Sequence, residues 1–312
     1  MKGLTMGQFV IAIDLGGHNL RFGLISENGE LIYQKKIKTV QDRDPDKIVR
    51  QISQECEEIL EDPEYSAYNP SAIGIGVPGF INSTDGVVNS SPNFPSWKFY
   101  PLVQRLSQNF KIPLVLENDA NCATVGEGWI GNAKDVRNFV LLTLGTGVGA
   151  GVIINQQLLR GSRGAGAELG HILIDPEGSP CGCGGKGCLE TLVSGTAIER
   201  KSGKKAKDLF QEALNGDPQA KKIFEQVGVD LGMAIADICF TFDPEKIAIG
   251  GRVAQAFEFF FPAIHRTMQE RLVNHPSRDT PVVPAKCGDD AGLYGAAKLA
   301  FEKLSMPLFW KR

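Results

Sequence analysis

Two stretches of the sequence decide the fold, and each joins two apolar runs through a glycine turn. The first is VIAIDLGGHNLRFGLISENGELI, residues 10–32, and the second is VLLTLGTGVGAGVIINQQLLRG, residues 140–161. In each, an apolar strand ends at a small polar residue, Asp14 or Thr143, and a glycine turn leads to a second strand and a hairpin. The offset of 129 residues is about the size of one domain. We interpret the chain as two related α/β halves; the alternative is two unrelated glycine-rich turns.

The rest of the chain alternates short apolar strands with helices. A helix with an apolar stripe from Ile48 to Ile59 is expected after Asp44-Pro45, and a long helix from about Asp217 to Phe242. Gly228 and Gly232 in the long helix permit close approach of another element. Further strands are expected at AIGIGV, PLVLE, KIAIGG and PVVPAK, and a last, small-residue helix at AGLYGAAKLA.

Charge and hydropathy exclude several classes of function. The net charge of −3 argues against nucleic acid as a partner, because neutralising phosphates needs an excess of lysine and arginine. No apolar run approaches the ~18 residues of a membrane helix, and the run from Phe9 to Ile13 is too short for a signal-peptide core. We therefore expect a cytoplasmic protein without a membrane partner. Thiols stay reduced there, and the odd number of cysteines, seven, also argues against a disulfide framework.

The glycine turns are candidate phosphate-binding sites, because they expose backbone N–H groups that phosphate oxygens can approach. Neither turn has the Lys-Ser/Thr of a P-loop, and neither leads into a helix as the dinucleotide fingerprint requires. Gly250-Gly251 does lie between a strand and a helix, where a nucleoside or α-phosphate can bind. Asp14 can hold Mg²⁺ through water, or it can merely cap the turn.

Three cysteines, Cys181, Cys183 and Cys188, lie close together in a glycine-rich loop, with His171 upstream. Three thiolates and one imidazole are a closed tetrahedral set of the kind that binds structural zinc. The spacing is not that of a common zinc finger, so the pattern alone leaves a redox dithiol as the rival. Cys181 and Cys183 are separated by one residue rather than the two of a thioredoxin-like motif. A catalytic zinc would need an open coordination position.

Five motifs, taken in this order, resemble the ROK family of sugar kinases and repressors. They are DLGG at 14–17, ENDAN at 117–121, LGTGVGAG at 144–151, ELGH at 168–171 and CGCGGKGC at 181–188. The resemblance covers nearly the whole chain and implies an α/β fold of the actin-like ATPase (RNase H-like) class, with two related lobes around a central cleft. The first lobe is expected at residues 1–118, completed by a helix at 290–312. The second is expected at 119–289, with a zinc loop at 171–190.

The resemblance also implies roles for particular residues. Asp119 would be the general base that takes a proton from a sugar hydroxyl as it attacks the γ-phosphate; the alternative is that Asn118 or Asp119 only caps a helix. Structural zinc is implied at His171, Cys181, Cys183 and Cys188, leaving the second ring nitrogen of His171 to face the sugar. The implied sugar-binding residues are Gly79, Asn93, Asn118, Asp119, Glu168, His171 and Glu190. The residues implied for ATP and Mg²⁺ are Asp14, Gly16, Gly17, His18, Arg21, Gly145, Thr146, Gly147, Gly250 and Gly251; His18 stands where the family usually has threonine.

The implied activity is ATP-dependent phosphorylation of a hexose, with glucose at its 6-hydroxyl as the leading substrate. N-acetylmannosamine, N-acetylglucosamine, mannose, allose and fructose are alternatives because they share ring hydroxyls, and polyphosphate is an alternative donor. Repressors of the family carry an N-terminal helix-turn-helix domain, whereas this chain enters its first strand by Phe9. We therefore expect a kinase rather than a regulator or a non-catalytic sensor. The family further implies a homodimer.

Overall fold

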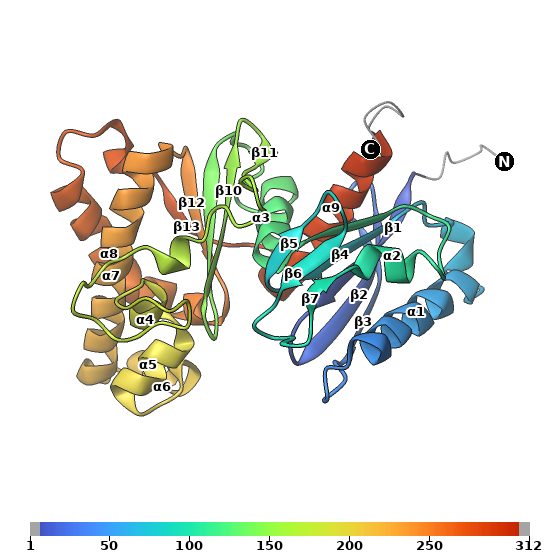
Figure 1. Ribbon diagram of the computed structural model, residues 1–312. Coiled ribbons are helices and arrows are strands. Elements are labelled where there is room, and N and C mark those ends of the chain that lie inside the picture. The colour runs from blue at the N-terminus through green and yellow to red at the C-terminus, as the bar shows by residue number, and fades with distance from the viewer. Residues whose placement is uncertain (1–6, 306–312) are drawn as a thin grey trace. The chain divides into compact units, whose positions relative to one another are not determined.

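The computed structural model describes residues 7–305, which form two compact units (Figure 1). The first unit contains the described residues up to Gly131, the segment Arg160–Gly166, and the described residues from Asp289 onward. The second contains Asn132–Leu159 and Ala167–Gly288. Among the described residues, no helix is both long and apolar enough to cross a membrane.

Each unit is built on a five-stranded sheet, and the two sheets have the same topology. The first has the order β3-β2-β1-β4-β8, and the second has the order β11-β10-β9-β12-β13. In both, the first two pairings are antiparallel and the last two are parallel. Asp14 of β1 lies opposite Gly76 of β4, as Thr143 of β9 lies opposite Gly250 of β12. The internal repeat predicted from the sequence is confirmed by this shared topology.

The strands and helices have the following bounds. In the first sheet they are β1 Phe9–Leu15, β2 Asn19–Ser26, β3 Leu31–Lys38, β4 Ile73–Val77 and β8 Leu114–Asn118; in the second, β9 Phe139–Leu144, β10 Val148–Ile154, β11 Gln157–Leu158, β12 Lys246–Gly250 and β13 Val282–Pro284. A small antiparallel sheet of the first unit contains β5 Phe80–Asn82, β6 Val87–Ser90 and β7 Lys98–Tyr100. The helices are α1 Pro45–Glu61, α2 Leu102–Leu106, α3 Asp119–Trp129, α4 Glu190–Val193, α5 Gly195–Ser202, α6 Ala206–Leu214, α7 Pro218–Phe242, α8 Phe257–Arg271 and α9 Ala291–Ser305.

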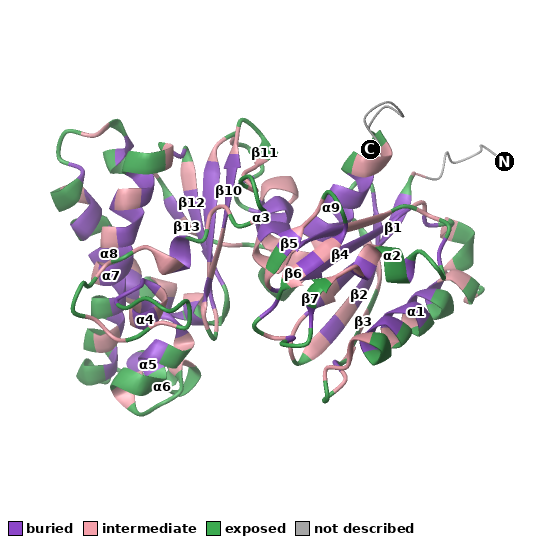
Figure 2. Ribbon diagram, in the orientation of Figure 1, coloured by how far each residue is buried: buried purple, intermediate pink, exposed green. Residues whose placement is uncertain are grey.

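Local sequence signals set the ends of the helices. Asp44 caps α1 by accepting a hydrogen bond from the Lys47 amide, and the predicted apolar stripe of α1 is buried. Asp217 caps α7 in the same way, and α7 ends at Asp243, which has a positive φ of 43°. Figure 2 shows α1 buried on one side only, whereas the central strands β1 and β4 are buried along their length. The amphipathic pattern thus places α1 against the first sheet.

Glycines allow helices α7 and α8, and helices α3 and α9, to pack backbone against backbone. A Cβ added at Gly228 would lie 2.2 Å from the Phe260 carbonyl oxygen of α8, as the glycines of α7 had predicted. A Cβ added at Gly126 of α3 would lie 2.3 Å from the Ala291 carbonyl oxygen of α9. This packing groups α3 with the first unit. The division between the units therefore falls after Gly131, whereas the sequence had suggested a boundary after residue 118.

Gly295→Ala is expected to destabilise the protein by at least about 2 kcal/mol, because overpacking a close contact forces the backbone to shift. The added Cβ would lie 1.6 Å from the carbonyl oxygen of Cys122, a backbone atom that cannot rotate away. Urea denaturation of the two proteins measures the change. Lys298→Ala on the same helix, at a half-exposed position, is the control and should stay within about 0.5 kcal/mol of wild type. Equal stability of Gly295→Ala and wild type would contradict this packing.

Candidate active site and metal cluster

Two carboxylates lie at the same edge of the first sheet, at the ends of strands β1 and β8 on either side of β4. Strands β1, β4 and β8 are parallel, so their carboxyl ends lie at one edge of the sheet, where Asp14 and Asp119 are placed. Both residues are half-buried. Burial, and next the charge of Asp119, raises the pKa of Asp14 to about 7, against the opposing effect of Arg21. Burial also raises the pKa of Asp119. The edge is suited to holding a cation or accepting a proton near neutral pH.

Asp14→Asn should become progressively more stable than wild type as the pH rises from 5 to 8. The Asp14 carboxyl titrates near 3.8 when unfolded and near 7 when folded, so between these values the folded state binds the additional proton. Its contribution to stability is therefore lost as the pH rises through 7, and asparagine, which does not ionise, avoids that loss. Melting temperatures of both proteins, measured with a chelator and without nucleotide, test this. A stability difference that is constant with pH would contradict it.

The first glycine turn lies against a predicted sugar-binding residue. A Cβ added at Gly17 would lie 2.4 Å from Nδ2 of Asn93, so only glycine lets Asn93 occupy this place. Arg43 donates to the Asn93 carbonyl oxygen at 2.7 Å and holds that loop. The turn itself closes through a hydrogen bond from the Gly16 amide to the Asn19 carbonyl oxygen at 2.9 Å. His18, at the tip, is exposed.

Arg21 is placed beside the turn but is engaged with the chain near the start of α9. It lies opposite Asp14 in the β1–β2 pairing, and its guanidinium donates to the Asp289 carboxylate at 2.8 Å. A Cβ added at Gly292 of α9 would lie 3.2 Å from Cγ of Asp14. The first turn of α9 therefore borders the same carboxylate as the glycine turn.

In the ENDAN motif, the helix cap and the predicted base are two different residues. The N-cap of α3 is Asn118, whose Oδ1 accepts from the Asn121 amide at 3.0 Å. Its Nδ2 donates to the Gly79 carbonyl oxygen at 3.0 Å, which brings two predicted sugar-binding residues together. Asp119 accepts from the adjacent Ala120 amide at 2.9 Å. Because Asn118 performs the capping, the Asp119 carboxyl is available for chemistry.

Sequence reasoning missed the ion pair between Glu117, the buried first residue of this motif, and the partly exposed Arg160. Glu117 Oε2 accepts from Nε of Arg160 at 2.6 Å. The position of Glu117 within ENDAN, at the end of an apolar strand, was a usable signal for it. Arg160 carries no such signal, because it is 43 positions from Glu117 in the sequence and only the fold brings the two side chains together.

The second unit gathers the remaining predicted phosphate-binding residues at the end of its own sheet. The Gly145 amide donates to the Gly147 carbonyl oxygen at 2.9 Å, and Thr196 Oγ1 donates to the Thr146 carbonyl oxygen at 2.8 Å. Gly251 has a φ of 85°, and a Cβ added to it would lie 2.4 Å from the Leu144 carbonyl oxygen. Gly250-Gly251 therefore lies next to the glycine turn at Gly145–Gly147. This proximity is what we expect if both segments bind the same nucleotide.

Glu190 links the second glycine turn to the cysteine loop. Its Oε2 accepts from the Val148 amide at 3.0 Å, and a Cβ added at Gly147 would lie 2.3 Å from the same oxygen. Its Oε1 accepts from the Cys181 thiol at 3.7 Å. Glu168, the other predicted sugar-binding carboxylate of this unit, is exposed and immediately precedes a single 3₁₀ turn, Leu169–His171.

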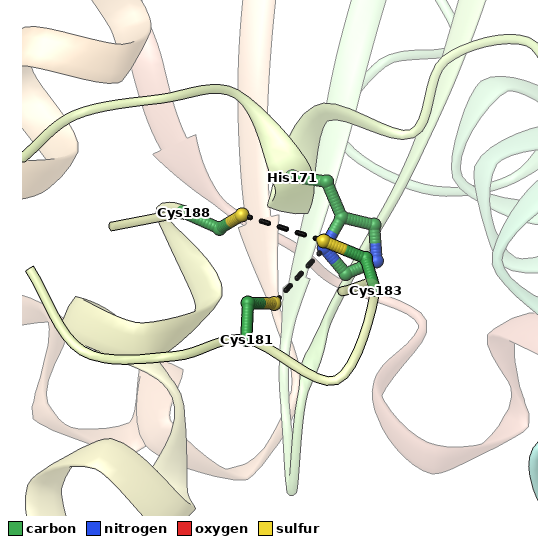
Figure 3. A group of neighbouring side chains, drawn as sticks. All are labelled: His171, Cys181, Cys183 and Cys188. Atoms are coloured by element: carbon green, nitrogen blue, oxygen red, sulfur yellow. Dashed lines mark hydrogen bonds between the residues drawn. The ribbon is translucent and has the colours of Figure 1, made fainter. Parts of the chain in front are cut away.

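The side chains of His171, Cys181, Cys183 and Cys188 converge, as Figure 3 shows. Their ligand atoms lie within 4.8 Å of one another. The thiols of Cys183 and Cys188 are 3.6 Å apart, and the Cys181 thiol is 3.5 Å from His171 Nδ1. Zinc–sulfur bonds of about 2.3 Å in a tetrahedron give sulfur–sulfur distances of about 3.8 Å, so this donor set fits zinc. The geometry, with its soft donors, supports the predicted zinc site, and the zinc itself stays a prediction.

Burial raises the pKa of the Cys188 thiol to about 12, and the Gly185 amide, which donates to Cys183, lowers the pKa of that thiol. Three cysteines outside the cluster, Cys56, Cys122 and Cys239, are buried in helices and serve as small core residues.

Comparison with known proteins decides the family. A model described as "ROK family" matches residues 10–303. The chain belongs to the ROK family. Its two related five-stranded sheets are accordingly those of the actin-like ATPase fold, as the motifs had implied.

Relatives of this ROK protein include sugar kinases of similar length. It is 35% identical to a glucokinase of Thermotoga maritima, with 95% of this chain and 98% of the relative covered. It is 33% identical to an N-acetylmannosamine kinase of Haemophilus influenzae, with 92% and 93% covered. A crystal structure of a ROK family glucokinase from Streptomyces griseus, in complex with glucose and AMPPNP, matches with 31% identity and a TM-score of 0.79, covering 94% and 99%. On these findings the ROK protein is a sugar kinase, an enzyme that transfers phosphate to a hydroxyl group.

Proposed function

We propose that this kinase transfers the γ-phosphoryl group of ATP to a hexose, with glucose at its 6-hydroxyl as the first candidate. The observation that carries the proposal comes from the ENDAN motif: Asn118 caps α3, and the Asp119 carboxyl beside it lies close enough to Asp14 for its charge to raise the pKa of Asp14. The similarity to the Thermotoga glucokinase and to the Streptomyces glucokinase with glucose and AMPPNP supports both the sugar and the nucleotide.

In the proposed reaction, Asp119 accepts the proton of the sugar hydroxyl. The hydroxyl oxygen forms a bond to the γ-phosphorus, the bond from that phosphorus to the β–γ bridging oxygen breaks, and ADP leaves. Burial raises the pKa of the Asp119 carboxyl, which makes it a better acceptor for this proton than an ordinary aspartate. The hydrogen bond from Asn118, the neighbour of this base, to Gly79 supports a role for both residues in sugar binding. Asn93 packs on Gly17, in the glycine turn that follows Asp14.

Two metal ions have separate proposed roles. Asp14 would hold Mg²⁺ through water, and bound Mg²⁺ neutralises charge on the phosphates. Zinc, when bound by His171 and the three cysteines, would have a structural role only, because four protein ligands leave no position for water or substrate. The loop would then fix the ring of His171 and, because Glu190 lies two residues after Cys188, the start of α4 that carries Glu190.

N-acetylmannosamine is the second candidate substrate, favoured by the similarity to the Haemophilus kinase. The experiment is a coupled assay of glucose, mannose, allose, fructose, N-acetylglucosamine and N-acetylmannosamine with ATP, GTP or polyphosphate. We expect the highest kcat/KM for glucose with ATP, and NMR of the product should place the phosphate on the 6-hydroxyl. A higher kcat/KM for N-acetylmannosamine would make that sugar the substrate in place of glucose, and the absence of turnover with every hexose would reject the proposal.

A homodimer and a cytoplasmic location, which the sequence had suggested, stay predictions. Light scattering tests the oligomeric state.

A further inference from the structure

The carboxylate of Glu117 accepts four hydrogen bonds although the residue is only 2% exposed. Its Oε1 accepts from the Asn118 amide at 2.9 Å and from Asn121 Nδ2 at 3.0 Å. Its Oε2 accepts from Ser83 Oγ at 3.1 Å and from Arg160 Nε at 2.6 Å. A carboxylate offers about four lone-pair positions, and here all of them are used. Glu117 therefore holds the end of β8 and the first turn of α3 in one arrangement.

The single cation in this network comes from a loop that is closed and docked on the first unit. The Gly166 amide donates to the Arg160 carbonyl oxygen at 2.9 Å and closes the loop Arg160–Gly166. Gly164 has a φ of 69°, and a Cβ added to it would lie 1.9 Å from the Ile81 carbonyl oxygen of β5. The loop is thus held by backbone packing as well as by its ion pair.

The chain on either side of this loop belongs to the second unit. β11 precedes it, and Ala167, Glu168 and His171 follow it. Ala167 has a φ of 63°, a left-handed conformation that a non-glycine residue keeps only where its surroundings hold it. This position immediately precedes Glu168, a predicted sugar-binding residue.

We propose that Arg160 is a positioning residue for phosphoryl transfer: it neutralises Glu117, and Glu117 fixes the strand end that carries Asn118 and Asp119. The inference rests on the proposed function of Asp119. Without the guanidinium, a buried carboxylate is left without its counter-charge. Glu117 must then take up a proton or draw in water, and either change alters the bonds to Asn118 and Asn121. A displacement of about 1 Å in a catalytic group can lower the rate by about 10².

The test compares Arg160→Met with the double variant Glu117→Gln/Arg160→Met. The single variant should lower kcat by about 10–100-fold and raise the sugar KM, with the nucleotide KM within about twofold of wild type. The double variant should recover at least about tenfold of that kcat, because it removes the unpaired charge together with its partner. Arg163→Met, an exposed arginine of the same loop, is the matched control and should behave as wild type. Arg160→Lys should give intermediate values and serves if Arg160→Met does not fold.

Hydrogen–deuterium exchange of the peptide spanning residues 117–125 provides a measurement that does not depend on turnover. We expect faster exchange in Arg160→Met than in wild type and Arg163→Met, with partial reversal in the double variant. Wild-type kcat and exchange in Arg160→Met would overturn the proposal, as would a double variant no better than the single one. Should wild type phosphorylate no hexose, the proposed function fails, while the exchange data still decide whether Arg160 positions this strand end.

Discussion

Asp119→Asn should lower kcat by about 10²–10⁴-fold, which corresponds to about 2.7–5.5 kcal/mol in the barrier, while the protein stays folded. Asparagine has nearly the same shape and can still accept the hydrogen bond from the Ala120 amide, but it cannot take up the hydroxyl proton. The helix loses no cap, because Asn118 supplies it. The variant should also be at least as stable as wild type near pH 7, since burial penalises the charged carboxylate there.

Steady-state kinetics over the hexose panel, together with a melting curve for each protein, measures this effect. Asp44→Asn is the matched control: it makes the same change at the start of α1, where Asp44 does act as the cap, and asparagine caps a helix about equally well. The control should keep wild-type kcat. A folded Asp119→Asn variant with normal turnover would show that Asp119 is not the base.

The parts of the site that lie within one strand–turn unit could be predicted from the sequence. The apolar runs around DLGG and LGTGVGAG predict strands and turns through local rules, and their similarity predicts two sheets of one topology. The cysteine loop is likewise local: three ligands lie within eight residues, and His171 begins the same segment, so few conformations keep them apart. Each of these predictions needs only short-range information.

Contacts between distant segments could not be predicted in this way. The pairing of Glu117 with Arg160 depends on a loop of the chain returning to the first unit, and no periodicity encodes that return. The same holds for the packing of α3, because Gly126 of α3 contacts the backbone of α9, a helix that is distant in the sequence. The identity of the capping residue in ENDAN was also open, because asparagine and aspartate are equally good caps and only side-chain geometry distinguishes them.

Cys183→Ser should raise the sugar KM by about tenfold or more and reduce bound zinc from one ion per chain to nearly none. Residues that support a metal site typically change affinity or activity by about 10–100-fold when replaced, and Cys183 would be a ligand itself. In the structure His171 Nδ1 lies 3.5 Å from the Cys181 sulfur. Glu190 follows Cys188 by two residues and accepts from the Val148 amide of the second glycine turn. Loosening the loop therefore disturbs two sugar-binding candidates at once. Effects on the nucleotide KM should be smaller, since the turn retains its backbone bonds.

Metal analysis, sugar titration and melting curves with and without a chelator measure these effects. Cys287→Ser is the control, because Cys287 is half-buried but lies outside the cluster; it should retain zinc and the sugar KM. A chelator should lower the melting temperature of wild type and of the control but not of Cys183→Ser, because metal that binds only the folded state adds to its stability. If the purified wild-type enzyme is fully active without zinc, and Cys183→Ser keeps the wild-type KM, the cysteine loop organises the sugar-binding residues without a metal, and its thiols need another explanation.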